Sequence, residues 1–259
     1  GFFFVIDRTN GQFISAKNFV DVNWATGYDK NGRPIENPES RSADKPYDAI
    51  PGPYGAHNWH PMSFNPQTGL VYLPAQNVPI NLMDDKAWTF NGAKPMQPGG
   101  NTGWNTAKFL NAEPPKSKPF GRLLAWDPVR QQVAWSHEQV SPWNGGTLTT
   151  AGNLVFQGQA DGLLKAYKAD TGEEVLSFEI GAGISAPTIS YTVDGRQHIA
   201  LLVGWGGSMA AVGGSLNAQH GWAYKAQMRR LISLCSWLPV ASAVVLSCES
   251  NSARSCSLV

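Results

Sequence analysis

Apolar residues in this chain occur in short runs that alternate with polar positions and end at glycine, proline or asparagine. Residues 163–167, Leu-Leu-Lys-Ala-Tyr, show the alternation expected of a strand with one buried face. The 27 glycines and 18 prolines interrupt these runs and leave little room for long amphipathic helices. The pattern therefore predicts an all-β protein.

Two strand patterns recur along the chain. Residues 68–76 and 151–159 each contain a glycine-led apolar run that ends in a small residue and Gln. Residues 125–135 are similar to residues 166–176 and, more faintly, to residues 5–11, and each of these segments predicts a strand followed by a tight polar turn. Repeated four-stranded antiparallel sheets, the blades of a β-propeller, explain both patterns, and we expect three to four blades.

The predicted turns carry residues suited to reversing the chain. An Asp or Asn side chain can accept a hydrogen bond from the amide two residues further on, and glycine adopts positive φ without strain. We expect the first role for Asp7, Asn65 and Asp127, and the second for Gly11, Gly69 and Gly172.

Two segments interrupt the repeats. Residues 21–54 and 77–120 are rich in Pro, Gly, Asn and Lys and show no regular periodicity. They predict long loop insertions at the rim of the propeller. Such loops carry function in some proteins and only cap neighbouring blades in others.

Charge excludes one class of partner. The chain has 20 basic and 19 acidic residues, with a net charge of +1 and no basic block. Because a nucleic-acid partner requires clustered positive charge, we expect no nucleic-acid binding.

The C-terminal tail, residues 231–259, differs from the rest of the chain. It contains all three cysteines and is rich in serine. Residues 231–248 are apolar enough to be considered as a membrane anchor, but Pro239 and the interspersed serines weaken that interpretation. An aberrant terminus, as a shifted reading frame would produce, is the favoured alternative, and we expect membrane contact only if residues 231–248 are an anchor.

One repeated turn resembles a motif of a known family. Ala125, Asp127 and Trp135 fit the tryptophan-docking motif of the alcohol dehydrogenases that depend on pyrroloquinoline quinone (PQQ). Arg130 and Gln131 replace the motif's Thr-Gly in this copy. In the second copy Ala166, Thr171 and Gly172 fit the motif, whereas Lys168 and Leu176 replace its Asp and Trp.

Three longer strings resemble the soluble quinohaemoprotein branch of the same family. They are Gly-Ala-His-Asn-Trp-His-Pro-Met-Ser-Phe at 55–64, Pro-Trp-Asn-Gly-Gly-Thr at 142–147, and Val-Gly-Trp-Gly-Gly at 203–207. The resemblance extends from Gly1 to about Leu231. It implies an eight-bladed propeller roughly twice as long as this chain, of which residues 1–230 would form the C-terminal blades and residues 231–259 an atypical tail.

The resemblance also implies where the chemistry lies. Members hold PQQ at the propeller axis, where Ca²⁺ polarises the quinone and an Asp acts as the base on the alcohol. Those calcium ligands and that Asp are expected upstream of Gly1, so we assign no catalytic residue and no metal ligand in this chain. The five histidines form no metal-ligand pattern, and we expect them to be structural or exposed.

Six residues are candidate contacts to PQQ. Asn58 and Trp59 match the family's pair at the polar edge of the quinone, where an amide can bond an oxygen and an indole can exclude water. The alternative is a core Trp with a turn-capping Asn. Gly204 and Trp205 would let the backbone approach the cofactor or would form a simple bend. Trp143 and Asn144 lie in an equivalent loop and are weaker candidates.

The function implied by the resemblance is oxidation of a primary or secondary alcohol in the periplasm, with electrons passed to a cytochrome. Family members of this branch carry haem c on a C-x-x-C-H motif, which is absent here. We expect the isolated fragment to be inactive. The alternatives are a non-enzymatic propeller scaffold for protein partners and a degraded gene copy.

Overall fold

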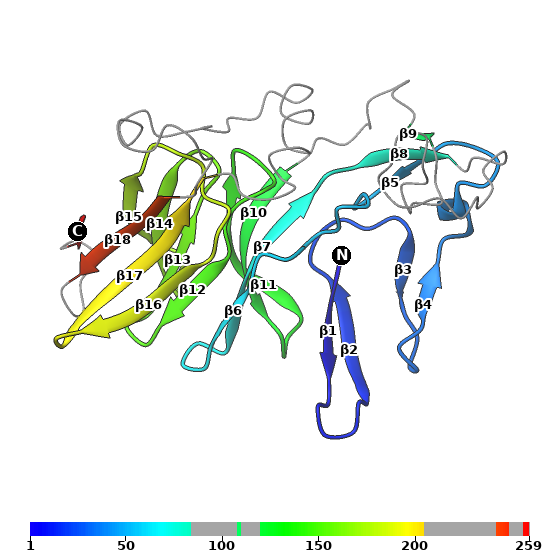
Figure 1. Ribbon diagram of the computed structural model, residues 1–259. Helices are drawn as coiled ribbons and strands as arrows, with labels where there is room; N and C mark the ends of the chain where they lie inside the picture. Colours follow the sequence, from blue (N-terminus) through cyan, green and yellow to red (C-terminus); the bar gives the residue numbers. More distant parts are fainter. Residues whose placement is uncertain (84–107, 110–119, 205–241, 249–255, 259) are drawn as a thin grey trace, which may run out of the picture. The chain divides into compact units, whose positions relative to one another are not determined.

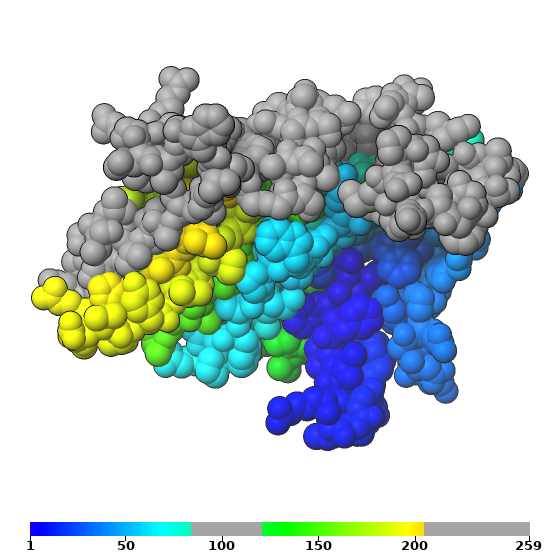
Figure 2. Space-filling view, viewed as in Figure 1, coloured from blue at the N-terminus to red at the C-terminus, as the bar shows by residue number. Residues whose placement is uncertain are grey.

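The computed structural model describes residues 1–83, 108–109, 120–204, 242–248 and 256–258 (Figure 1; Figure 2 shows the same view in space-filling form). The chain divides into two compact units. The first comprises Gly1–Ala56 and Asn77–Lys118, and the second comprises His57–Gln76 and Pro119–Val259. Each unit is described separately below.

The second unit consists of three four-stranded antiparallel sheets, which confirms the predicted all-β blades (Figure 1). In each sheet the chain runs through the strands in sequence order, so every sheet is a meander. The first sheet contains β6 (Ser63–Asn65), β7 (Leu70–Asn77), β10 (Phe120–Asp127) and β11 (Gln132–Gln139). The second contains β12 (Thr147–Thr150), β13 (Leu154–Gly158), β14 (Leu163–Lys168) and β15 (Glu174–Glu179). The third contains β16 (Thr188–Val193), β17 (Arg196–Val203), β18 (Ser242–Cys248) and β19 (Cys256–Leu258).

The first unit contains a hairpin and two small sheets. The hairpin joins β1 (Phe2–Ile6) to β2 (Phe13–Asn18), and its register shifts between Val5 and Ile6. The hairpins β10–β11 and β14–β15 show the same shift, between Ala125 and Trp126 and between Ala166 and Tyr167. The shared bulge confirms that residues 1–18 carry the same strand–turn–strand repeat as the later sheets.

The two predicted insertions are more ordered than their composition suggests. They form the strands β3 (Ala25–Tyr28), β4 (Pro34–Glu36), β5 (Tyr47–Ala49), β8 (Ile80–Met83) and β9 (Lys108–Phe109), with a 3₁₀ turn η1 (Pro38–Arg41). β5 of one insertion pairs with β8 of the other. Strands of two to four residues are too short to show a period of two in the sequence.

The predicted turn chemistry is confirmed at all six positions. The carboxylates of Asp7 and Asp127 and the amide oxygen of Asn65 each accept a hydrogen bond from the amide two residues further on, at 2.8–2.9 Å. Gly11, Gly69 and Gly172 adopt φ values of 75°, 69° and 77°.

The apolar core of the second unit lies between neighbouring sheets. One cluster joins Leu70 and Tyr72 of β7 to Val155 of β13, and another joins Leu164 of β14 to Leu201 and Val203 of β17. Each sheet therefore buries its apolar face against the next sheet along the chain, as the blades of a propeller do.

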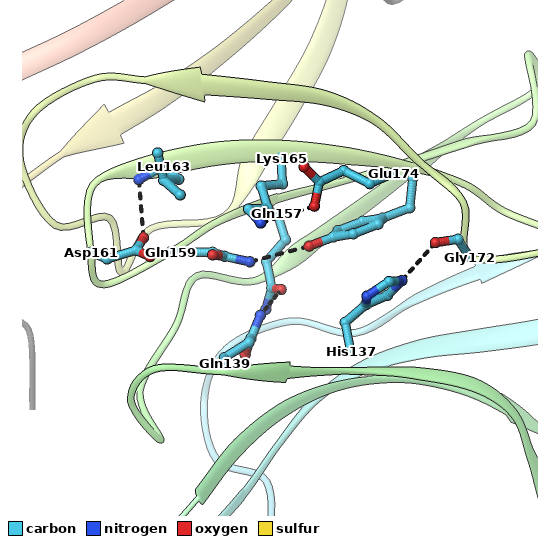
Figure 3. Close-up of polar contacts among 10 residues, drawn as sticks. His137, Gln139, Gln157, Gln159, Asp161, Leu163, Lys165, Gly172 and Glu174 are labelled. Atoms are coloured by element: carbon cyan, nitrogen blue, oxygen red, sulfur yellow. Dashed lines mark hydrogen bonds and ion pairs between the residues drawn. The ribbon is translucent and has the colours of Figure 1, made fainter.

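Trp135 of β11 docks on the following sheet, as its motif predicts. Its indole N–H donates to the carbonyl oxygen of Ala169 at 3.0 Å. A Cβ atom added to Gly172 would lie 2.7 Å from the Trp135 ring, so only glycine accommodates the indole at this turn. His137 accompanies it, with Nε2 2.6 Å from the Gly172 carbonyl and its ring stacked on Tyr167 (Figure 3).

The tail contributes backbone to the third sheet. β18 pairs with β17 along its whole length, from Gln197 opposite Cys248 to Val203 opposite Ser242. The rest of the candidate anchor, residues 231–241, lies outside the described residues. In the part of the chain that the structure describes, no helix has the length and apolar character needed to cross a membrane.

Candidate functional site

The candidate site is built from two loops that precede the first strands of neighbouring sheets. One loop leads into β6 and the other into β12, and the two are bonded to each other: the Thr147 amide donates to the Pro61 carbonyl oxygen at 2.9 Å. Gly146 must be a glycine, because an added Cβ would lie 2.5 Å from Cδ of Pro61. The Gly-Gly of the second motif therefore permits the close approach of the two loops.

Asn58 and Trp59 lie on the loop before β6, and both side chains are exposed. Trp59 is 52% exposed, which is unusual for a residue of this size. The amide oxygen of Asn58 accepts a hydrogen bond from the Trp59 amide at 2.9 Å. The alternative of a core Trp is therefore wrong for Trp59, whose side chain is half exposed.

Trp143 and Asn144, on the loop before β12, are buried. Trp143 is 5% exposed. The Asn144 side-chain nitrogen donates to the Gln139 amide oxygen at 2.7 Å and to the Ser141 carbonyl oxygen at 2.8 Å, while its oxygen accepts from the Ala160 amide at 3.1 Å. Both amide protons and the oxygen of Asn144 are thus engaged in the protein. Direct contact of this pair with PQQ stays a prediction, and the observed contacts give Asn144 a structural role.

Asn144 belongs to a chain of buried amides between the first and second sheets. The Gln139 side chain bonds to that of Gln157 (Figure 3). The Gln157 side-chain nitrogen donates to the Gly145 carbonyl oxygen at 2.9 Å. Gln159 donates to the Tyr167 hydroxyl at 3.2 Å. Burial raises the pKa of Tyr167 far above its usual value of 10, so this hydroxyl remains neutral and can accept the bond.

His60 connects the two loops, a role that the sequence did not reveal. Its buried ring stacks on Trp59, with centroids 4.3 Å apart and an interplanar angle of 24°. The same ring meets Trp143 edge-on, with centroids 5.7 Å apart at 77°. The structure thus brings Trp59 and Trp143 together through His60. The only signal in the sequence was the aromatic neighbour of His60, which cannot show burial.

Both histidines of this loop are neutral near pH 7. Burial, with a smaller contribution from the charge of His57, lowers the pKa of His60 to about 4. Burial also lowers the pKa of His57, although its ring N–H donates to the Pro74 carbonyl oxygen at 2.9 Å and opposes that shift. The exposed Trp59 therefore lies over an uncharged platform.

The third predicted motif is described only in part. Gly204 has φ 128°, a conformation that favours glycine, and its amide donates to the Gly183 carbonyl oxygen at 2.9 Å. Gly204 also forms an isolated parallel bridge with Ile184. This agrees with the expected glycine-dependent bend. Trp205 lies outside the described residues, and its contact with PQQ stays a prediction.

The described residues fit a planar, polar-edged cofactor better than they fit a hydrolytic centre. Trp59 offers a half-exposed aromatic ring, Asn58 an exposed amide, and Gly204 a glycine backbone at positive φ. Within the described ranges, no three His, Cys, Asp or Glu residues lie together as metal ligands would.

Meandering four-stranded sheets that pack face to face, with a docked Trp between the first and the second, define this protein as a β-propeller. The family model "PQQ: Glucose/ethanol/alcohol dehydrogenase, beta-propeller domain" matches residues 33–199, and the chain belongs to this family.

Two curated relatives are similar over most of this chain. The quinohemoprotein alcohol dehydrogenase of Comamonas testosteroni is 72% identical over 207 residues, which are 80% of this chain and 29% of the relative. The 1-butanol dehydrogenase (cytochrome c) of Thauera butanivorans is 57% identical, with 80% and 30% covered. The chain therefore spans about 30% of the length of these relatives.

A solved structure confirms the fold. The crystal structure of the quinohemoprotein alcohol dehydrogenase from Comamonas testosteroni matches with a TM-score of 0.74 at 72% identity, over 80% of this chain and 31% of that one. The similarity supports the predicted partial propeller and the family resemblance of the chain to PQQ-dependent alcohol dehydrogenases.

Proposed function

We propose that this chain forms one wall of the PQQ pocket in an alcohol dehydrogenase that oxidises a primary or secondary alcohol and passes electrons to a cytochrome. The observation that carries the proposal is the half-exposed indole of Trp59, held on buried His60 beside the exposed Asn58. An exposed aromatic face on a rigid support costs little entropy when a flat ligand binds to it.

Bound PQQ would supply the two-electron redox chemistry that alcohol oxidation requires. The residues of this chain bind and orient. The Trp59 indole covers the cofactor and excludes water, and the Asn58 amide meets a polar edge. Gly204 leaves space for a cofactor to approach the backbone. Trp205 would extend the same wall.

The remaining groups belong to the part of the protein that this chain does not include. We place the Ca²⁺ ligands, the carboxylate that removes the alcohol proton, and any haem c there. The name of the Thauera relative, 1-butanol dehydrogenase (cytochrome c), supports an alcohol substrate and a cytochrome acceptor. A periplasmic location is part of the same proposal and rests on the resemblance.

The test is to titrate the purified 259-residue chain with PQQ and then add Ca²⁺, a primary alcohol and an electron-accepting dye. We expect saturable quenching of tryptophan fluorescence by PQQ but no dye reduction, because the proposed base and metal ligands lie elsewhere. Alcohol-dependent dye reduction would overturn that placement. Absence of saturable quenching would overturn the assignment of a PQQ wall.

A further inference from the structure

One residue, His60, stacks on the Trp59 indole and fixes its orientation. Trp59 is half exposed, so few protein groups touch it, and its only ring contact among the described residues is the stack on His60. An exposed side chain with two free torsions would otherwise lose entropy when a ligand fixed it. The stack removes part of that cost in advance.

His60 is itself held by rings and not by hydrogen bonds from its buried nitrogen. Its side chain is 2% exposed, and Nε2 is buried without a hydrogen-bond partner. The ring stacks on Trp59 and forms a T-shaped pair with Trp143. Because burial keeps the imidazole neutral near pH 7, it stacks as a flat, uncharged ring.

Trp143, in turn, belongs to the rigid part of the molecule. The next residue, Asn144, is held by three hydrogen bonds to Gln139, Ser141 and Ala160. The loop before β12 is therefore fixed to both the first and the second sheet, and Trp143 is a stable partner for the T-shaped contact with His60.

We propose that His60 is a positioning residue of the cofactor wall: its ring fixes the Trp59 indole in the orientation that meets PQQ, and it transmits the position of the loop before β12 to the loop before β6. This inference rests on the proposed function for the identity of the ligand. The positioning of Trp59 by His60 is independent of that identity.

The experiment uses three substitutions of His60 in the 259-residue chain. His60→Ala removes the platform, His60→Leu fills its volume without a flat ring, and His60→Phe restores a ring of similar shape. The matched control is His198→Phe, because His198 also stacks on a single aromatic ring, Tyr191, with centroids 5.3 Å apart on the third sheet. Each variant is made with and without Trp59→Phe, so that the difference isolates the Trp59 emission.

Two kinds of measurement are made at 10 °C on variants whose far-ultraviolet circular dichroism matches that of the parent. The first is the emission maximum and acrylamide quenching of Trp59 without PQQ. The second is the dissociation constant of PQQ from fluorescence quenching. We expect His60→Ala and His60→Leu to shift the Trp59 emission to the red, to increase its quenching and to raise the dissociation constant about tenfold. His60→Phe should restore both quantities, and His198→Phe should change neither.

The outcomes separate this inference from the proposed function. If His60→Leu leaves both the Trp59 emission and the PQQ affinity unchanged, His60 does not position Trp59 and the inference is wrong. If the parent chain binds no PQQ but His60→Leu still shifts the Trp59 emission, the proposed function fails while the positioning stands. A role of His60 in stability alone would lower the melting temperature without moving the Trp59 emission of the folded chain.

Discussion

The loops before β6 and β12 carry the same residue types in equivalent places, and the structure gives them opposite roles. Each loop contains an adjacent Asn and Trp and leads into the first strand of a sheet. Asn58 and Trp59 are exposed, whereas Trp143 and Asn144 are buried and Asn144 is fully hydrogen-bonded. Asn and Trp in equivalent loops can therefore be either exposed or buried between the sheets.

The difference depends on what lies next to each pair. Asn144 lies five residues after Gln139, the last residue of β11, and bonds back to it, so its amide is satisfied within the protein. Asn58 and Trp59 are exposed, and His60 is the one ring among the described residues that stacks on the indole. The loop before β12 is part of the packed protein interior, and the loop before β6 carries the exposed Asn58 and Trp59.

The largest contrast is expected from removing each indole. Trp143→Ala should lower the free energy of unfolding by about 3–5 kcal/mol, because it leaves a cavity among buried groups. Trp59→Ala should lower it by about 1 kcal/mol or less, since half of that side chain is already in water. Urea unfolding followed by circular dichroism measures both values. Equal losses for the two variants would contradict the division of roles.

The second contrast concerns pH. In the folded chain the pKa of His60 is about 4, compared with 6.5 for an unperturbed histidine. Between these values the unfolded chain binds a proton that folded His60 does not. The contribution of His60 to the free energy of unfolding is therefore fully present above pH 6.5. The free energy of unfolding should fall by about 3 kcal/mol as the pH is lowered to 4.

His60→Phe removes this proton uptake and is the control for the pH effect. The variant should keep the falls caused by the other groups whose pKa burial lowers, His57 and the N-terminal amine of Gly1. Unfolding curves in urea at half-unit pH steps give the slope. Parallel slopes for the parent and His60→Phe would show that His60 is not responsible.

The third contrast is between the two asparagines. Asn144→Ala should lower the free energy of unfolding by about 2 kcal/mol, because it leaves the Ala160 amide and the Gln139 oxygen without this partner. Asn58→Ala should change it by less than about 0.5 kcal/mol, as is usual for an exposed position. Thermal unfolding of both variants tests the prediction, and a larger loss for Asn58→Ala would reverse the assignment of roles.

The smallest expected effect concerns affinity alone. Trp59→Phe keeps an aromatic face but reduces its area, and it should weaken PQQ binding about three- to tenfold with unchanged unfolding behaviour. Trp135→Phe, at the docking position between the first and second sheets, is the matched control. That variant should lower stability while the folded chain keeps its PQQ affinity. A weaker affinity in the control and not in Trp59→Phe would overturn the assignment of Trp59 to the wall.

Local chemistry made much of the fold predictable. The turns depend on residues two to four positions apart, such as Asp127 with the Val129 amide and Gly172 at positive φ, and such contacts can be recognised in any chain. The paired strands of the insertions could not be predicted. β5 and β8 lie in separate segments, and neither has a pattern until the other is placed beside it.

The sequence by itself determined the class of protein, the repeated strand–turn–strand unit and the candidate loops with their Asn and Trp residues. Only the tertiary structure decided which of those residues are available. Exposure depends on contacts between distant segments: the loop that carries His60 meets Trp143 more than eighty positions further along the chain, and Asn144 is satisfied by Gln139 and Ala160. Because burial arises from such contacts, an adjacent Asn and Trp are buried and structural in the loop before β12. The same two residue types are exposed and form a candidate cofactor wall in the loop before β6.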